Sequence, residues 1–279
     1  MNPQVAIIAP GAMGSAVGRR LSDNDVKVVT VLEGRSAESV KRADAARMIA
    51  VKPHDLCRAD IFLSIVPPAH AVSLAKRLAG SFAQSVKNPI YVDCNAINPG
   101  TTAEIARIME DAGCSFVDGG IIGGPPREGA PGPVFYLSGV RAAAVAELAR
   151  FGLECRVLDG GVGAASALKM SYAGITKGLT ALASMAILAA ERAGVAADLR
   201  AELCRGQPAL LSWFERQIPS MYPKAYRWVA EVEEIAQFTA GDEAARELFA
   251  STAKFYQRLA RDFEGAETGV LSRFFRGND

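Results

Sequence analysis

Short apolar runs alternate with longer stretches of helical spacing through the first half of the chain. Each apolar run has the length and the β-branched content of a buried strand. These runs occupy residues 5–9, 26–32, 61–67, 89–95, 115–121 and 134–139. The stretches of helical spacing occupy residues 13–21, 36–48, 69–82 and 100–113. Strands that alternate with helices of about a dozen residues are typical of a parallel doubly wound sheet.

The pattern changes after residue 160, where the strand-like runs end. A long apolar stretch near 163–193 predicts one extended helix. Further helical stretches follow at 196–205, 208–217, 223–239 and 242–264. We expect the tail SRFFRGND (272–279) to be frayed. The fold class is therefore α/β, with an N-terminal Rossmann doubly wound parallel sheet and a C-terminal all-helical domain entered by a long interdomain helix.

A glycine-rich stretch, LDGGVGAAS at 158–166, marks the predicted junction between two domains. We expect a dinucleotide-binding Rossmann domain over 1–161 and a helical substrate and dimerisation domain over 162–279. The 279 residues of the chain are enough for two such domains.

The long helix is apolar on nearly every side, so something must cover it. Lys169 and Lys177 interrupt the apolar residues, and each charge would cost a few kcal/mol in a bilayer. We therefore favour a helix buried in a soluble protein over a membrane span. A second subunit can complete what the small helical domain leaves uncovered, so we expect a homodimer built around this helix.

Charge and cysteine usage narrow the classes of partner and compartment. The 31 basic and 30 acidic residues leave a net charge of +1, which argues against a nucleic-acid-binding protein. Five cysteines lie scattered without metal-ligand spacing, which favours reduced thiols in the cytoplasm and no metal site. The two histidines, His54 and His70, stand alone, and we expect neither to be catalytic. The first residues do not have the pattern of a signal peptide.

The stretch IIAPGAMGSAVGRRL (7–21) has the order of strand, glycine loop and helix that a Rossmann unit needs. Gly11 lets the backbone approach a pyrophosphate, and Gly14 lets the helix pack close to the strand. The N-terminus of the helix presents free N–H groups to phosphate oxygens. Ala9 replaces the usual first glycine, and a tight turn without a ligand is the alternative interpretation.

The end of the second strand carries two competing signals for the cofactor. Glu33 follows Gly14 by nineteen residues, the spacing of an acid that binds the ribose hydroxyls of NAD. Arg35 and Ser36 come directly after it, and a guanidinium can bind the 2′-phosphate of NADP. We favour NADP over NAD. The carboxylate of Glu33 must then turn away from the 2′-phosphate, because the two negative charges repel each other. A solvated Arg35 without a ligand is the alternative.

Four stretches fall in the same chain order as the motifs of one enzyme family. These stretches are APGAMGSAV with Met13, SIVPPAHA, DCNAINPGTT with Asp93 and Pro99, and FVDGGIIGGPP with Asp118. The chain thereby resembles the β-hydroxyacid dehydrogenase family, which includes 3-hydroxyisobutyrate dehydrogenase and is similar to imine reductases and 6-phosphogluconate dehydrogenase. Ile122 stands where this family has a substrate-binding serine.

The glycine loop, the turn after the second strand and this resemblance together define the expected binding residues. For the cofactor these are Gly11, Ala12, Met13, Gly14, Arg35, Ser36, Val66, Pro67, Pro68 and Asn95. For the substrate they are Ile122, Gly123 and Gly124.

A fifth stretch, GVGAASALKMSYAG, resembles the helix that carries the catalytic lysine of the family. Lys169 falls on that lysine, and Ala173 replaces the asparagine four residues further on. Tyr172 and Lys177 share the face of Lys169. A lysine beside a second lysine in an apolar cleft releases its proton more readily, so Lys169 is the expected acid and Tyr172 a second donor. Lysines that extend to solvent are the alternative.

These features predict an NADP-dependent oxidoreductase that interconverts a small hydroxy acid, or a related alcohol, with its carbonyl compound. An imine reductase of the same fold is one alternative, because the family serine and asparagine are replaced. A dinucleotide-binding sensor without turnover is the other. Further along the chain, we expect Glu231 to pair with Arg227 at helical spacing.

Overall fold

The computed structural model describes residues 2–126 and 132–276, which form two compact units. One unit comprises Met1–Met170 and the other Ser171–Asp279. The division falls within a single long helix, α6 (Ala164–Arg192). Each unit is described separately below.

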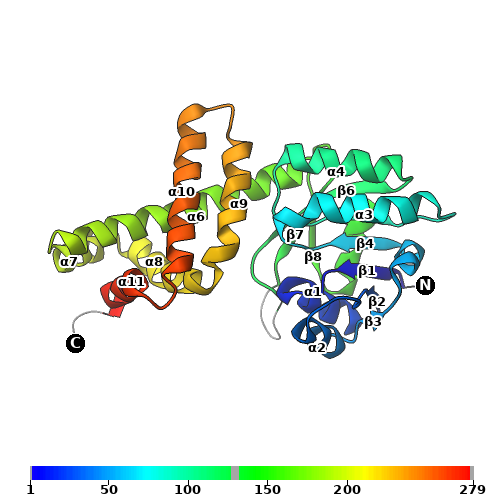
Figure 1. Ribbon diagram of the computed structural model, residues 1–279, viewed down its shortest axis with the longest axis horizontal. Coiled ribbons are helices and arrows are strands. Elements are labelled where there is room, and N and C mark those ends of the chain that lie inside the picture. The colour runs from blue at the N-terminus through cyan, green and yellow to red at the C-terminus, as the bar shows by residue number, and fades with distance from the viewer. Residues whose placement is uncertain (1, 127–131, 277–279) are drawn as a thin grey trace. The chain divides into compact units, whose positions relative to one another are not determined.

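The N-terminal unit is built on an eight-stranded sheet with the strand order β3-β2-β1-β4-β5-β6-β7-β8 (Figure 1). Its strands are β1 (Gln4–Ile8), β2 (Lys27–Thr30), β3 (Ile49–Ala50), β4 (Ile61–Ser64), β5 (Ile90–Asp93), β6 (Ser115–Ile122), β7 (Val134–Ser138) and β8 (Glu154–Val157). The central strands run parallel, so the predicted doubly wound sheet is confirmed.

The sheet departs from a purely parallel one at β7, which runs antiparallel to β6. Residues 123–133 alone join these two strands, and a parallel neighbour would need a crossover of about a dozen residues or more. Two short strands, β3 and β8, were not expected from the sequence. Both are at edges of the sheet and largely exposed, so they lack the apolar alternation of an inner strand.

Helices cover both faces of this sheet and bury a separate core on each. The helices are α1 (Ala12–Ser22), α2 (Ala37–Ala45), α3 (Ala71–Ala83), α4 (Pro99–Asp111) and α5 (Ala142–Ala146), with 3-10 turns η1 (Pro53–Arg58), η2 (Pro68–His70) and η3 (Glu147–Phe151). Val5 of β1 packs in the same core as Val17 of α1. The next residue, Ala6, faces the other core with Leu74 of α3 and Ile105 of α4. Helices α3 and α4 lie side by side (Figure 1).

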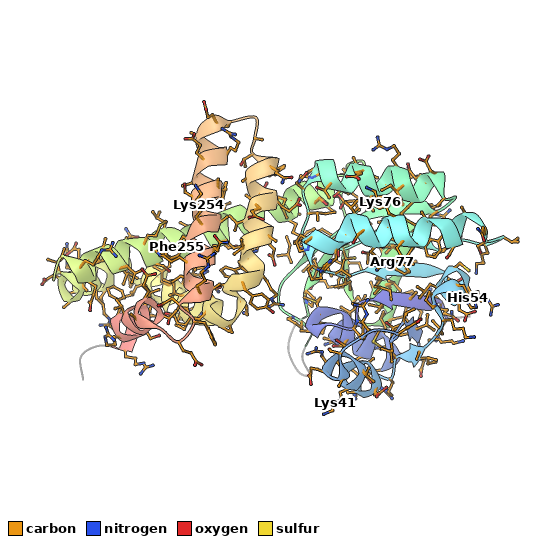
Figure 2. The ribbon with its side chains drawn as sticks, viewed as in Figure 1. Lys41, His54, Lys76, Arg77, Lys254 and Phe255 are labelled. Atoms are coloured by element: carbon orange, nitrogen blue, oxygen red, sulfur yellow. The ribbon has the colours of Figure 1, made fainter. Side chains whose placement is uncertain are left out.

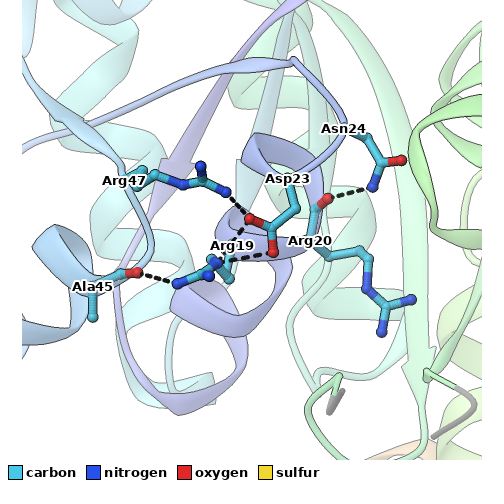
Figure 3. A network of polar contacts seen from close by, with 6 residues as sticks. All are labelled: Arg19, Arg20, Asp23, Asn24, Ala45 and Arg47. Atoms are coloured by element: carbon cyan, nitrogen blue, oxygen red, sulfur yellow. Dashed lines mark hydrogen bonds and ion pairs between the residues drawn. The ribbon is translucent and has the colours of Figure 1, made fainter. Parts of the chain in front are cut away.

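A network of polar contacts ties the end of α1 to the turn after α2 (Figure 3). Arg19 donates from Nε to both carboxylate oxygens of Asp23 at 2.8 Å and from Nη1 to the carbonyl of Ala45 at 2.8 Å. Arg47 also pairs with Asp23. These side chains are partly exposed, so each pair adds about 1 kcal/mol or less. The network therefore links α1 to α2, the two helices that follow β1 and β2.

The second unit is entirely helical over its described residues. After α6 come α7 (Ala196–Gly206), α8 (Pro208–Met221), η4 (Tyr222–Lys224), α9 (Ala225–Phe238), α10 (Glu243–Arg261) and α11 (Ala266–Arg276). Helix α11 contradicts the expectation of a frayed tail as far as residue 276, and residues 277–279 lie outside the described part. Asp262 accepts a hydrogen bond from the amide of Thr268 at 3.0 Å, and Leu271 and Phe274 are buried.

Helix α6 packs closely against the hairpin of α9 and α10 because it has no side chain at Gly174. A Cβ atom there would lie 3.2 Å from Phe249 and 3.4 Å from Ile235. By length and composition α6 is a candidate membrane span, and 39% of its most apolar window is buried within the chain. The single chain therefore leaves one side of this helix uncovered.

Candidate active site

The N-terminus of α1 is open to an anion. Gly11 is the N-cap residue and no side chain caps the helix, whose first turn holds no acidic residue. Ser15 turns inward and donates from both its amide and its hydroxyl to the carbonyl of Gly11, at 2.9 and 2.7 Å. The first amides of α1 therefore remain available to a phosphate group.

The two glycines of the loop meet different demands. A Cβ atom at Gly14 would lie 2.0 Å from the carbonyl oxygen of Ala9, so this position requires glycine for the helix to pack on the strand. A Cβ atom at Gly11 meets nothing within 4 Å. Ala12 is exposed, and Met13 is partly buried against the core. The loop is therefore tight at Gly14, where the helix packs on the strand, and open at Gly11.

The turn after β2 carries the residues expected at the adenosine ribose. Gly34 has a φ of +70°, which favours glycine, and Glu33 on its N-terminal side is exposed. Arg35 is half-buried. The hydroxyl of Ser36 accepts a hydrogen bond from the amide of Ser39 at 3.3 Å and caps α2. Ser36 therefore has a structural role at the start of α2, while the binding roles of Arg35 and Ser36 stay predictions.

Asn95 joins the carboxyl ends of β4 and β5. Its Nδ2 donates to Ser64 Oγ and to Asp93 Oδ2, both at 2.8 Å, and its Oδ1 accepts from the amide of Val66 at 2.7 Å. The residue is 2% exposed. Pro67 and Pro68 follow Val66 and start η2. Asn95 therefore shapes the predicted cofactor loop from within, and its direct contact with a cofactor stays a prediction.

Asp93 is a buried acid at the same strand end, and its pKa is raised to about 7. Burial is the largest cause. Hydrogen bonds from Asn95 oppose it, the neighbouring carboxylate of Asp118 adds to it, and the charge of Lys169 opposes it. Burial also raises the pKa of the adjacent Cys94 thiol far above its ordinary range, which makes this thiol unreactive.

We expect this acid to make the stability of the protein depend on pH. The ordinary pKa is 3.8, so between about pH 4 and pH 7 the folded state holds a proton that the unfolded chain has released. The free energy of unfolding should therefore fall as the pH rises, by about 2–3 kcal/mol between pH 5 and pH 8. Urea titrations followed by circular dichroism at several pH values measure this free energy of unfolding.

Asp93→Asn is the matched variant, because an amide has the shape of the neutral acid and does not titrate. The difference in unfolding free energy between wild type and variant should change with pH, since the contributions of groups that do not interact with Asp93 cancel. A difference that stays constant from pH 5 to pH 8 would contradict the raised pKa of Asp93.

Lys169 reaches the carboxyl end of β5 from the first turns of α6. Its Nζ donates to the carbonyl of Cys94 at 3.4 Å, and its side chain is partly buried. Gly120 of β6 permits this approach, because a Cβ atom there would lie 2.8 Å from the carbonyl oxygen of Ala165. The N-terminal unit thus holds both the predicted acid and the glycine loop.

Asp118 fixes the start of α6 and was known from the sequence only as a motif match. Its Oδ2 accepts from the amides of Gly163 and Ser166 at 2.9 and 3.0 Å, and its Oδ1 from the Ser166 hydroxyl at 2.6 Å. Ser138 donates to the same carboxylate at 3.2 Å. A carboxylate at a helix N-terminus is favourable. Asp118 therefore sets the position of the helix that carries Lys169.

The expected substrate residues end β6. Ile122 is half-buried. Gly123 has a φ of +124°, and a Cβ atom there would lie 2.9 Å from Pro133, so this turn needs glycine. Gly124 is exposed and has open space around it. Their contact with a substrate stays a prediction.

Tyr172 and Lys177 belong to the helical unit. Tyr172 is 52% exposed, and its catalytic role stays a prediction. Lys177 forms a 2.6 Å ion pair with Glu231 and lies 5.3 Å from the centre of the Trp228 ring. The expected Arg227–Glu231 pair is wrong, because Glu231 turns to the more buried ammonium and Arg227 stacks on a neighbouring tyrosine. Lys177 is thus neutralised locally.

Neither histidine belongs to this strand-end network. His54 lies on the outer surface at η1 (Figure 2), and His70 is exposed in η2. Within residues 2–126 and 132–276, no group of three or more His, Cys, Asp or Glu side chains is placed to hold a metal ion.

Comparison with known proteins gives the class of this site. Residues 4–151 match the family described as the NAD binding domain of 6-phosphogluconate dehydrogenase, and residues 190–259 match a domain of unknown function, DUF1932. A relative from Methanothermus fervidus, an uncharacterized 28.5 kDa protein, is 31% identical over 70% of this chain and 74% of its own length. The chain belongs to the β-hydroxyacid dehydrogenase family.

Solved structures agree with this assignment. A conserved protein of unknown function, described as similar to 3-hydroxyacid dehydrogenases, is 28% identical with a TM-score of 0.72 over 94% of this chain and 100% of its own. The 3-hydroxyisobutyrate dehydrogenase of Mycobacterium tuberculosis, solved with L-serine, has 18% identity and a TM-score of 0.75 over 97% and 98%. An imine reductase of Myxococcus stipitatus in complex with NADP+ has 17% identity and a TM-score of 0.54 over 92% and 99%. Family membership makes this chain an NAD(P)-dependent dehydrogenase or reductase.

Proposed function

We propose that this protein is an NADP-dependent oxidoreductase that interconverts a small hydroxy acid, or a related alcohol, with its carbonyl compound. The observation that carries the proposal is Lys169, whose ammonium lies against the Cys94 carbonyl in the unit that also holds the open glycine loop. The amides at the start of α1 would bind the pyrophosphate.

The proposed chemistry needs one proton donor from the protein. When bound, the reduced nicotinamide supplies a hydride to the carbonyl carbon of the substrate. Negative charge then builds on the carbonyl oxygen, and the Lys169 ammonium neutralises it by donating a proton. The product is the alcohol and Lys169 is left as an amine, which serves as the base in the reverse direction.

The preference for NADP rests on Arg35 in the turn after β2. This guanidinium is half-buried and forms no ion pair with the described carboxylates, so it is available to a 2′-phosphate. We expect Arg35→Ala to weaken binding of NADP(H) by about 10- to 100-fold, the size of a lost charged hydrogen bond. Binding of NAD(H) should change by less than about threefold.

Fluorescence titration with NADPH and NADH measures both affinities. Lys41→Ala removes a positive charge from the exposed surface of the following helix and serves as the control for long-range charge. Equal losses for both cofactors in Arg35→Ala would show that Arg35 does not read the 2′-phosphate.

Turnover tests the proposed reaction directly. The purified protein is mixed with NADPH and, separately, with 2-oxo acids, 3-oxo acids, aldehydes and cyclic imines, and the absorbance of NADPH is followed. We expect oxidation of NADPH with an oxo acid or aldehyde. Turnover with cyclic imines alone would favour an imine reductase, and NADPH binding without turnover on any substrate would favour a sensor.

A homodimer is proposed from the uncovered side of α6. Large apolar side chains lie exposed on the part of this helix that belongs to the helical unit, at spacings of four and three residues: Ile175, Leu179 and Leu182. Such spacing forms the seam by which helices pair with one another. A second copy presents the same seam, so pairing of two α6 helices buries both.

We expect Leu182→Glu to convert the dimer to a monomer. Leu182 is 60% exposed in the single chain, and burying a glutamate in a dimer seam costs several kcal/mol, so the dissociation constant should rise at least about 100-fold. Leu248→Glu is the matched control, because Leu248 has a similar exposure, 58%, and belongs to another helix, α10. Sedimentation equilibrium measures the association, and equal masses for both variants would contradict the proposed interface.

The proposed compartment is the cytoplasm, and the proposed partners are a small-molecule substrate and a second copy of the chain. All five cysteines are free thiols, as expected where the surroundings are reducing.

A further inference from the structure

Hydrogen bonds connect the buried carboxyl group of Asp93 with the loop after β4, and Lys169 binds the peptide next to it. The side chain of Asp93 receives two hydrogen bonds from Asn95, from its amide to Oδ1 at 3.0 Å and from its Nδ2 to Oδ2 at 2.8 Å. Asn95 in turn holds the amide of Val66, in the loop after β4. The peptide carbonyl of the residue after Asp93 receives the ammonium of Lys169.

We propose that Asp93 is a positioning residue, which holds the Lys169 ammonium at the end of β5 and ties that place to the loop after β4. This inference rests on the proposed role of Lys169. Asp93 does not touch the reacting atoms: it acts on the loop through Asn95, and on Lys169 through its charge and the strand end that it braces.

The buried position of Asp93 strengthens the interaction of its charge with neighbouring charged groups. It is 1% exposed, so water does not screen it. Among the described residues, the titratable groups that interact with its charge are Tyr91 on its own strand, Cys94 directly after that strand, Asp118 on β6 and Lys169 on α6. Lys169 is the positive one, and its field favours the ionised form of Asp93. By reciprocity, an ionised Asp93 favours the charged form of Lys169.

The network also has two ends with different predicted roles: the loop after β4 and the lysine on α6. Val66 precedes Pro67 and Pro68, where the chain turns into η2, and Lys169 projects from α6. Asn95 holds the amide of Val66 and both oxygens of Asp93. The network therefore joins the predicted cofactor loop to the strand end that receives Lys169.

The test measures how readily Lys169 reacts with an amine-specific acylating reagent, as a function of pH. Peptide mass spectrometry reports the modification of Lys169 itself, and neither cofactor nor substrate is needed. The variants are Asp93→Asn, which removes the charge and keeps the shape, and Ser64→Ala, which removes a hydrogen bond from the same network and keeps the charge.

We expect the midpoint of Lys169 modification to move to lower pH by about one unit in Asp93→Asn, because the amine loses a neighbouring negative charge. Ser64→Ala should leave the midpoint unchanged. An unchanged midpoint in Asp93→Asn, or equal shifts in both variants, would overturn the inference, since a merely structural effect does not depend on charge.

A measurement on the wild type covers the case in which Asp93→Asn does not fold. Reductive methylation with carbon-13 labels the lysines, and the signal of Lys169 is assigned by its absence in Lys169→Arg. Coupling to a carboxyl group with a pKa of about 7 should give this signal an inflection near pH 7. A signal that is flat across pH 6–8 would contradict the inference.

The substrate panel and this experiment fail independently. Coupling between Asp93 and Lys169 without turnover on any substrate would refute the proposed reaction and leave the network intact. Turnover without coupling would support the proposed reaction and refute the proposed role of Asp93.

Discussion

Lys169→Ala should lower kcat by about 100- to 10,000-fold and leave the affinity for NADPH within about threefold of wild type. A positioned general acid contributes a factor of this size, and its loss leaves the developing charge on the substrate oxygen without a proton. The glycine loop and the turn after β2 are untouched by the change. Steady-state turnover on the best substrate of the panel and fluorescence titration with NADPH measure the two quantities.

Two further variants distinguish the loss of a proton donor from the loss of a positive charge and from a nonspecific effect of removing a lysine. Lys169→Arg keeps a positive charge that does not release its proton near neutral pH, so it should remain slow. Lys254→Ala removes an exposed lysine on α10 (Figure 2) and should turn over like wild type. Normal turnover in Lys169→Ala would eliminate Lys169 as the acid, and full activity in Lys169→Arg would assign it a purely electrostatic role.

The fold class and the glycine loop could be predicted from the sequence because both depend on local spacing. The apolar run that forms β1 and the glycines at 11 and 14 lie within one short segment, and the geometry of one strand, one turn and one helix determines their roles. Lys169 was proposed from the resemblance of a stretch on a single helix to a family motif, and its catalytic role stays a prediction.

Interactions between distant segments could not be predicted in this way. Lys177 and Glu231 are 54 residues apart and belong to different helices, so the rule of helical spacing instead paired Glu231 with Arg227. The side chain of Asn95 binds Val66 and Ser64, 29 and 31 residues earlier in the chain, and no spacing rule predicts these hydrogen bonds. A single sequence does not reveal which of several polar residues turns inward.

The elements at the edges of the structure were not predicted for another reason. Strand β8, with the sequence ECRV, is paired on one side only and exposes most of its side chains, so no apolar period marks it. Helix α11 (Ala266–Arg276) follows Gly265 and overlaps the tail at 272–279 that was expected to be frayed. Its start is set by Asp262, which lies before the helix and caps it from there.

The different demands on the two glycines of the loop lead to the sharpest test of cofactor binding. Gly11→Asp should raise the dissociation constant for NADP(H) at least about 100-fold without destabilising the protein. The backbone at Gly11 has a φ of −74°, which any residue adopts, and an added Cβ atom meets nothing within 4 Å. An aspartate at the N-cap of α1 would stabilise the helix by a few tenths of a kcal/mol. The same carboxylate would bind the amides that a pyrophosphate needs and repel its charge.

Gly14→Ala is the contrasting variant, because its added methyl group collides with the carbonyl of Ala9. It should lose about 1–3 kcal/mol of unfolding free energy, as expected for overpacking against the backbone. Urea unfolding and NADPH titration of both variants therefore separate the site from the scaffold: Gly11→Asp should change binding alone, and Gly14→Ala should change stability. If Gly11→Asp binds NADPH as tightly as wild type, the phosphate does not lie at the start of α1, and the assignment of the cofactor site is wrong.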